Sequence, residues 1–287
     1  MIEPIALYGC EVWGLGYEFS TWDKHPVEAL HTEFCKSILR VQRKTPNTAC
    51  RAELGQYPLI INIQKRALKF WQHIKMSNPN SLHHIALQCQ EQNIARSPLS
   101  QLVLRLSDLT LSHITEAQDN VTVARTIRPN QITNNEKENY ITYWKEITKT
   151  QSKLQCYLAL KHEYIIATYL STLKDPKLRK TTTMYRLSEH SLSIEKGRHR
   201  QTWLPREERL CSHCSLGSVE TELHFLTECP KYEEIRTLLF NKLNSTLPEF
   251  LTWSNEDKLP YILGENKDVA ILAAKFVAAC HNLRDSQ

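Results

Sequence analysis

The sequence predicts a mainly α fold, with an N-terminal helical bundle followed by C-terminal helices that carry a small zinc knuckle. Apolar residues recur at helical spacing along most of the chain, whereas no run of alternating polar and apolar residues indicates strands. Glycine is scarce, with 7 in 287 residues and none between Gly55 and Gly197. Such a stretch favours helices, which rarely need a positive φ, and it excludes a glycine-rich phosphate loop there.

The predicted helices of the N-terminal region start at polar caps or at prolines. Pro26 opens the first, which carries an apolar stripe as far as Val41. Thr45 and Pro46 start the second, because a polar cap followed by proline at the first helical position is a common start signal, and Gly55 ends it. The next helices are predicted over Pro58 to Met76, Ser81 to Ile94 and Pro98 to Leu109.

Further along the chain, residues 119–139 are rich in asparagine, threonine and charge, and we predict a polar linker there. A helix is predicted over about 151–173, and Asp175 followed by Pro176 starts another that runs to about His190. The last helices are predicted after Pro230 and over Lys267 to Arg284. The predicted regions are 1–118 (helical), 119–139 (linker), 140–209 (helices and basic segment), 210–232 (zinc knuckle) and 233–287 (C-terminal helices).

Three cysteines and one histidine have the spacing of a metal site. Cys211 and Cys214 form a Cys-x2-Cys pair, whose knuckle turn lets two thiolates converge on one ion. Nine residues separate Cys214 from His224, and four more precede Cys229. Four protein ligands complete a tetrahedral set, so we predict one structural Zn²⁺ with no open position. The alternatives are free cysteines in a loop with an incidental histidine, and a set in which His213 replaces one ligand.

The cysteine usage favours a reducing compartment, because the 9 cysteines are odd in number and three of them cluster in the knuckle. The N-terminus lacks the basic region and long apolar run of a secretory signal. The longest apolar stretch, Val269 to Cys280, contains Lys275 and is shorter than the about 20 residues that span a bilayer. We therefore expect an intracellular protein, cytoplasmic or nuclear, that is neither secreted nor bound to a membrane.

The positive charge of the chain is concentrated directly before the knuckle. Between Lys174 and Arg209 lie ten Lys/Arg and five Asp/Glu, so this basic window carries the whole formal net charge of +5. Its cations can follow a phosphate backbone, and Tyr185 and Trp203 can stack on bases, a contact worth about 1–3 kcal/mol each. A solvated surface with charge for solubility is the plainer alternative. The candidate nucleic-acid contacts are Arg179, Lys180, Tyr185, Arg186, Arg198, Arg200, Trp203, Arg206 and Arg209.

A family resemblance rests on these residues. The stretch from Arg206 through the four predicted ligands to Tyr232 resembles the C-terminal zinc-knuckle region of LINE-type (non-LTR) retrotransposon reverse transcriptase polyproteins. Upstream, Met184-Tyr-Arg-Leu-Ser and Ile194-Glu-Lys-Gly-Arg resemble the basic segment before that knuckle. At the N-terminus, Leu7-Tyr-Gly-Cys-Glu-Val-Trp-Gly resembles the tail that follows the polymerase core. The resemblance implies a fragment from the region after the polymerase, with the rest of such a polyprotein as a possible partner.

Catalysis is not expected. The polymerase of that family needs a carboxylate cluster with paired aspartates, whereas this sequence contains no Asp-Asp pair and no endonuclease domain. Gly-x-Ser-x-Gly, His-Glu-x-x-His and Walker motifs are also missing, and no small-molecule substrate is indicated.

We therefore expect a non-catalytic, zinc-dependent fragment that binds RNA or single-stranded DNA, because knuckle modules engage unpaired bases. Three alternatives stay open. One is a helical protein-interaction scaffold whose zinc is purely structural. Another is a non-functional element remnant, and the third is an accessory activity supplied in trans to an intact reverse transcriptase.

Overall fold

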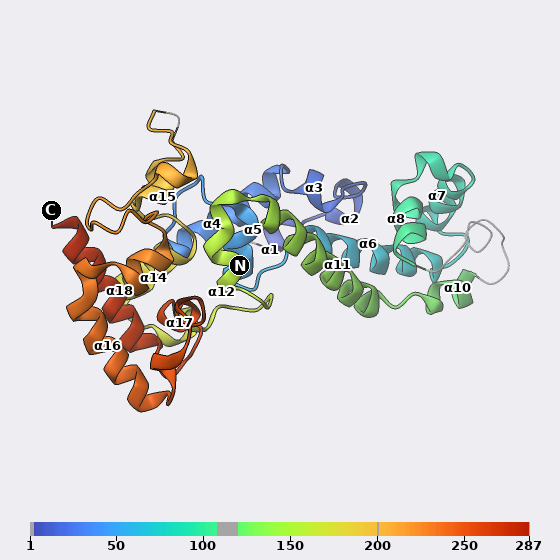
Figure 1. The fold of residues 1–287 in the computed structure, drawn as a ribbon. Helices are drawn as coiled ribbons and strands as arrows, with labels where there is room; N and C mark the ends of the chain where they lie inside the picture. The colour runs from blue at the N-terminus through green and yellow to red at the C-terminus, as the bar shows by residue number, and fades with distance from the viewer. Residues whose placement is uncertain (1–2, 108–119, 200, 287) are drawn as a thin grey trace. The chain divides into compact units, whose positions relative to one another are not determined.

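The computed structural model describes residues 3–107, 120–199 and 201–286, and it confirms a mainly α fold (Figure 1). Among these residues the chain forms helices and short helical turns, with no β-strand. Only two isolated β-bridges occur in the described part, Leu54 with Ile166 and Leu210 with Val219. The absence of strands follows from the helical periodicity of the sequence.

The chain divides into two compact units. Unit 1 contains Met1–His31 and Tyr57–Tyr143, and unit 2 contains Thr32–Gln56 and Trp144–Gln287. This division differs from the predicted one, which placed residues 32–56 in the N-terminal region. The difference arises because those residues pack with segments more than a hundred positions later in the sequence, a separation that local patterns do not report.

Unit 1 is built around α6 (Ile60–Lys75), whose apolar stripe is buried as predicted. Ala67, Leu68 and Trp71 in the middle of α6 are fully buried and belong to one hydrophobic cluster. The side chain of Glu28 caps the start of the helix, since its Oε2 accepts hydrogen bonds from Leu59 N at 2.9 Å and from Trp22 Nε1 at 2.6 Å. The other helices of this unit are α1 (Glu3–Ala6), α2 (Cys10–Trp13), α3 (Phe19–Trp22), the first part of α4 (Pro26–Leu39), α7 (Leu82–Glu91), α8 (Pro98–Leu106), α10 (Asn120–Thr126) and most of α11 (Pro129–Thr150).

The prediction of a polar linker over residues 119–139 was wrong. Most of that segment is helical, in α10 and α11, while residue 119 lies outside the described residues. One face of α11 is buried at Thr133, Glu136 and Tyr140, which follow one another at helical spacing. Two of these three buried residues are polar, so the composition of the segment did not reveal the buried face of α11.

Unit 2 is built around α18 (Ala270–Asp285), the predicted C-terminal apolar helix. This helix packs against α14 (Pro176–Arg186), α16 (Glu233–Thr246) and α17 (Asn255–Ile262) (Figure 1). The start of α14 is as predicted, because Asp175 Oδ1 accepts a hydrogen bond from Lys177 N at 2.8 Å and Pro176 occupies the first turn. The other helices of unit 2 are the end of α4, α5 (Asn47–Glu53), α12 (Gln155–Leu160), α13 (Thr168–Thr172) and α15 (Ser193–Lys196).

The predicted continuous helix over about 151–173 is interrupted. Its middle, between α12 and α13, runs alongside the end of α5, where Ala167 N donates to Glu53 O at 2.8 Å. Gly55 permits this approach, since a Cβ there would lie 2.7 Å from Ile166 N and its φ is +62°. The non-local pairing replaces the helical hydrogen bonds that the periodicity of this segment predicted.

Candidate metal centre

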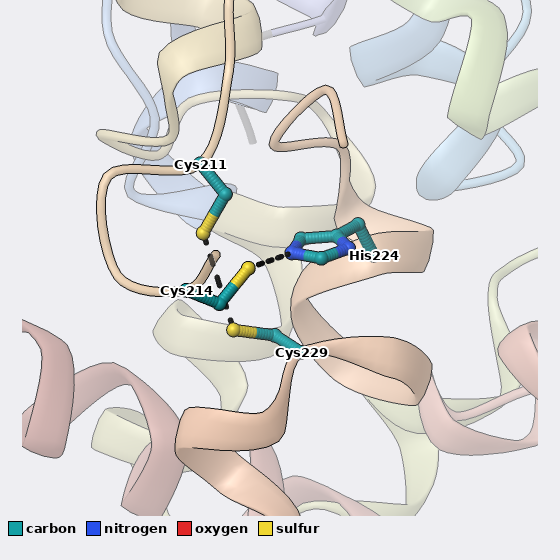
Figure 2. A group of neighbouring side chains, drawn as sticks. All are labelled: Cys211, Cys214, His224 and Cys229. Carbon is teal, nitrogen blue, oxygen red and sulfur yellow. Dashed lines mark hydrogen bonds between the residues drawn. The ribbon is translucent and has the colours of Figure 1, made fainter. Parts of the chain in front are cut away.

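The four predicted ligands converge on one point (Figure 2). Their donor atoms all lie within 4.8 Å of one another. Cys211 Sγ is 3.9 Å from Cys229 Sγ, and Cys214 Sγ is 3.4 Å from His224 Nε2. A tetrahedral zinc site has edges of about 3.8 Å between two sulfurs and about 3.6 Å between sulfur and nitrogen. The four side chains are therefore arranged so that they can hold a metal ion.

The first two candidate ligands lie in a short hairpin, which we call the Cys211 hairpin (residues 209–220). Cys211 N donates to Ser218 O at 2.9 Å, and Glu220 N donates to Arg209 O at the same distance. Gly217 turns the chain with a φ of +62°, a conformation that glycine adopts without a steric penalty. The hairpin thereby brings Cys211 and Cys214 to one side of the site.

The other two ligands come from a single π-helical turn, His224–Glu228, and the residue after it. Cys229 N donates to His224 O at 2.8 Å, so the wide turn places both side chains beside the hairpin. Pro230 follows immediately and begins the 3-10 turn that leads into α16, close to the predicted helix start.

The imidazole of His224 is oriented by a carboxylate. Its Nδ1 lies 3.4 Å from Glu228 Oε2, while Nε2 faces the sulfurs (Figure 2). Metal-bound histidines commonly have such a partner, which fixes the tautomer and the ring orientation. His213 takes no part in the group, because its Nδ1 lies 3.2 Å from Lys231 Nζ. The alternative ligand set with His213 is therefore not the one that the structure assembles.

The thiols need a cation to ionise. Burial raises the pKa of Cys229 to about 12, and the neighbouring thiols Cys211 and Cys214 add to the effect. Burial also raises the pKa of Cys211, although a backbone hydrogen bond from His213 opposes it. A coordinated metal ion deprotonates such thiols outright. Four protein donors leave no position for substrate, so the arrangement suits a structural ion.

Two glutamates anchor the ligand-bearing segment, residues 209–229, to the rest of unit 2. Glu220 forms a bidentate pair with Arg284 of α18, because its Oε1 accepts from Nε at 3.1 Å and its Oε2 accepts from Nη2 at 3.0 Å. Glu222 Oε1 accepts from Ser188 Oγ at 2.9 Å and lies 2.9 Å from His190 Nε2. Burial by itself raises the pKa of Glu222, but the interactions with His190 and Ser188 outweigh it and lower the pKa overall. The group of four candidate ligands is thus joined to the core of the unit, to which Cys211 and Cys229 themselves belong.

Two of the predicted nucleic-acid contacts lie in that core, and these predictions were wrong. Tyr185 is 1% exposed and stacks on Phe225, with ring centroids 5.1 Å apart. Arg186 is fully buried, where its Nη2 lies 2.9 Å from Glu53 Oε1 and its Nη1 donates to Leu263 O. Neither side chain can reach a nucleic acid in this conformation.

Two further predicted contacts use their guanidinium groups within the chain. Arg209 is also buried, and it donates to the main-chain oxygens of Leu204 and Ile194. Its prediction as a phosphate contact was wrong for the same reason. Arg179 is half-buried and donates from Nε and Nη2 to Leu173 O, at 3.0 and 2.6 Å.

Four predicted contacts remain accessible. Trp203 is 63% exposed, Lys180 and Arg206 are exposed, and Arg198 is half-buried. Arg200 lies outside the described residues. Arg198 donates from Nη1 to Ser152 Oγ at 2.8 Å and from Nε to Glu195 at 2.7 Å.

Arg198 and Arg206 line one hollow of about 250 Å³, together with Lys153 and with Thr221 and Leu223 of the ligand-bearing segment. A larger hollow of about 550 Å³ also contains Arg198 and Lys153 in its wall, as well as Lys44 and Lys196. The sequence did not single out Lys44 or Lys153, because they come from distant segments and lie outside the basic window. Acidic residues line both hollows: Glu195 and Glu222 lie in the wall of the smaller one, and Glu189 and Glu195 lie in the wall of the larger one.

No helix in the described ranges is long and apolar enough to cross a bilayer. Comparisons of the chain with protein-family models, with curated proteins and with solved structures gave no match.

Proposed function

We propose that the chain is a non-catalytic, zinc-dependent nucleic-acid-binding fragment derived from the reverse transcriptase of a non-LTR retrotransposon, which acts inside the cell on RNA or single-stranded DNA. One observation carries the proposal. Arg198 and Arg206 line a single hollow beside the metal centre, and an exposed tryptophan, Trp203, lies between them in the sequence.

Zinc is the ion that this donor set favours. Three thiolates and one imidazole are soft or borderline ligands, which suit Zn²⁺ and disfavour Mg²⁺ or Ca²⁺. The separations of 3.9 Å between sulfurs and 3.4 Å between sulfur and nitrogen fit a tetrahedral shell. The ion supplies rigidity to the hairpin, while the chain's own residues make the contacts with nucleic acid.

The accessible residues are of the kinds that bind single strands. Arg206 and Arg198 offer charge to a phosphate group at the 250 Å³ hollow. Trp203 offers an aromatic face, on which any base can stack. Stacking needs an unpaired base, so a single strand suits this surface better than a duplex. The family assignment is supported by the motif around the four ligands, and the sequence lacks the paired aspartates of a polymerase.

The test is a salt titration of the binding of a labelled single-stranded RNA. We expect the logarithm of the binding constant to fall linearly with the logarithm of salt concentration, because phosphate contacts release counterions. Arg206→Ala should reduce the slope by about 0.7, the single-strand value for one lost contact. Lys177→Ala is the matched control, since Lys177 is an exposed cation on α14 that is not a candidate contact and does not line this hollow.

An affinity independent of salt, or no binding at all, would contradict the proposal. An equal effect of the Lys177 and Arg206 variants would show that the hollow is not the site. Binding that persists unchanged after zinc removal would contradict the zinc dependence.

A further inference from the structure

Arg209 joins two parts of the chain through its side chain. Nε and Nη2 donate to Leu204 O at 2.9 and 2.8 Å, and Nη1 donates to Ile194 O at 3.0 Å. Ile194 belongs to α15, and Leu204 directly follows Trp203. The planar guanidinium is suited to this task, because it directs several donors in a fixed geometry.

The residues on both sides of Trp203 are held in place. Thr202 N donates to His199 O at 2.9 Å, and Thr202 Oγ1 donates to Lys196 O at 2.7 Å. Leu204 N donates to Gly197 O at 2.9 Å. We call residues 201–206 the Trp203 segment. Its tryptophan is exposed although its backbone is anchored, so little ordering is required when a base stacks on it.

Gly197 leaves the space that the stem of Arg209 occupies. A Cβ at this position would lie 2.7 Å from Cγ, Cδ and Nε of Arg209. The φ of Gly197 is −67°, so the backbone itself does not require glycine here. The close approach of the arginine is what excludes a side chain.

The backbone of Arg209 belongs to the Cys211 hairpin. Its carbonyl oxygen accepts from Glu220 N at 2.9 Å, and the ligand Cys211 is two residues further along. Arg209 is thus fixed to the hairpin through its main chain, and its side chain holds the Trp203 segment. Loss of the ion would loosen the hairpin and, through Arg209, the segment.

We propose that Arg209 is a positioning residue, which transmits the order of the Cys211 hairpin to the Trp203 segment. Trp203 is then presented to an unpaired base only while the metal centre is intact. The unpaired base as partner rests on the proposed function, whereas the coupling between hairpin and segment does not.

Hydrogen exchange tests the coupling directly. The amides of Thr202 and Leu204 are hydrogen-bonded, so their exchange rates report the opening of the segment. Arg209→Lys keeps the charge but loses the planar guanidinium that donates to Leu204 O and Ile194 O. It should therefore speed exchange of the Leu204 amide by at least about tenfold, while the zinc content stays unchanged. Gly197→Ala should act in the same direction by displacing the stem of Arg209. Arg96→Lys, at an exposed position outside the Trp203 segment and the hollow, is the matched control.

Zinc removal with a chelator completes this experiment. It should speed exchange of the Leu204 amide in the wild-type protein and add nothing further in Arg209→Lys. Unchanged exchange in Arg209→Lys, with helical circular dichroism intact, would overturn the proposal. So would a chelator effect on Leu204 that is as large in the variant as in the wild type.

RNA binding separates positioning from direct contact. Trp203→Ala should weaken binding of a labelled oligo(U) strand by roughly 5- to 150-fold, the value of one stacked base. Arg209→Lys should lower the affinity by no more than Trp203→Ala does. The double variant, which carries both substitutions, should bind no more weakly than Trp203→Ala alone. Because Lys keeps the charge, phosphate contact by residue 209 is tested with Arg209→Gln, which should leave the salt slope unchanged.

If the losses of affinity in Trp203→Ala and Arg209→Lys add up in the double variant, or if Arg209→Gln reduces the salt slope, residue 209 contacts a phosphate directly. Either result would overturn the positioning role. If no form of the protein binds the strand but the exchange results are as expected, the coupling stands and the proposed function fails.

Discussion

The basic window contains two regions that use their aromatic and cationic residues in opposite ways. In α14, Tyr185 and Arg186 are buried, and Arg186 is paired with Glu53. Further along, Trp203 and Arg206 are exposed, a few residues before the candidate ligand Cys211. The two regions have similar compositions, so composition does not decide which side chains meet solvent. What decides it is whether another segment offers a fixed partner: Glu53 lies 133 positions before Arg186.

The largest effect should come from breaking the buried pair in α14. Burial by itself would lower the pKa of Arg186, but Glu53 and Glu265 raise it above its usual value, so the guanidinium stays charged. Arg186→Met would leave Glu53 buried without this partner, and we expect a loss of about 3–5 kcal/mol in the free energy of unfolding, measured with denaturant. Arg206→Met should change stability by less than about 0.5 kcal/mol.

A double variant sharpens this prediction. Glu53→Gln in the Arg186→Met background removes the unpaired charge, and it should recover part of the lost stability. Equal destabilisation by Arg186→Met and Arg206→Met would contradict the contrast between the two regions.

A smaller effect is expected where the ligand-bearing segment joins the core. Glu222→Gln should cost about 1–3 kcal/mol at neutral pH, because the carboxylate holds Ser188 and His190. The pKa of Glu222 is lower in the folded protein than its usual value. Its ionised form therefore adds stability above the unfolded pKa of about 4.3, and this contribution is lost as pH falls through the folded pKa.

Unfolding curves recorded from pH 7 down to pH 3 test the direction of this pH dependence. The difference in stability between wild type and Glu222→Gln should shrink below about pH 4, while zinc loss at acid pH affects both proteins. The exposed Glu207→Gln is the control, with a difference near zero throughout. A wild-type advantage that grows as the pH falls would contradict the assignment.

The smallest expected effect on stability is that of Trp203→Ala. Its side chain is 63% exposed, so unfolding should change by less than about 0.5 kcal/mol, while the affinity for single-stranded RNA falls. Thermal unfolding and RNA titration on the same sample separate the two quantities. If Trp203→Ala lost as much stability as Arg186→Met, Trp203 would be needed for folding. The contrast between α14 and the exposed region of Trp203 and Arg206 would then not hold.

The sequence predicted what local chemistry determines. Asp175 and Pro176 mark the start of α14, and the spacing of the four ligands was sufficient to identify a group that the structure brings together. Both signals operate over short stretches, where a cap or a turn needs few partners.

Features that depend on distant partners were not predicted. The buried face of α11 contains Thr133 and Glu136, so hydropathy did not reveal it. The break between α12 and α13 depends on Ala167 pairing with Glu53, more than a hundred residues away. The interior positions of Arg186 and Arg209 likewise depend on acceptors in other segments, which residue type and charge do not disclose.

The proposed function depends on one zinc ion, held by four side chains at the end of the basic window. X-ray absorption at the zinc edge, together with metal analysis of the purified protein, tests it most directly. We predict about one zinc per chain, with three sulfurs at about 2.3 Å and one nitrogen at about 2.0 Å, and loss of the metal in Cys214→Ser and in His224→Ala. A protein without stoichiometric zinc, or a shell rich in oxygen, would contradict the account.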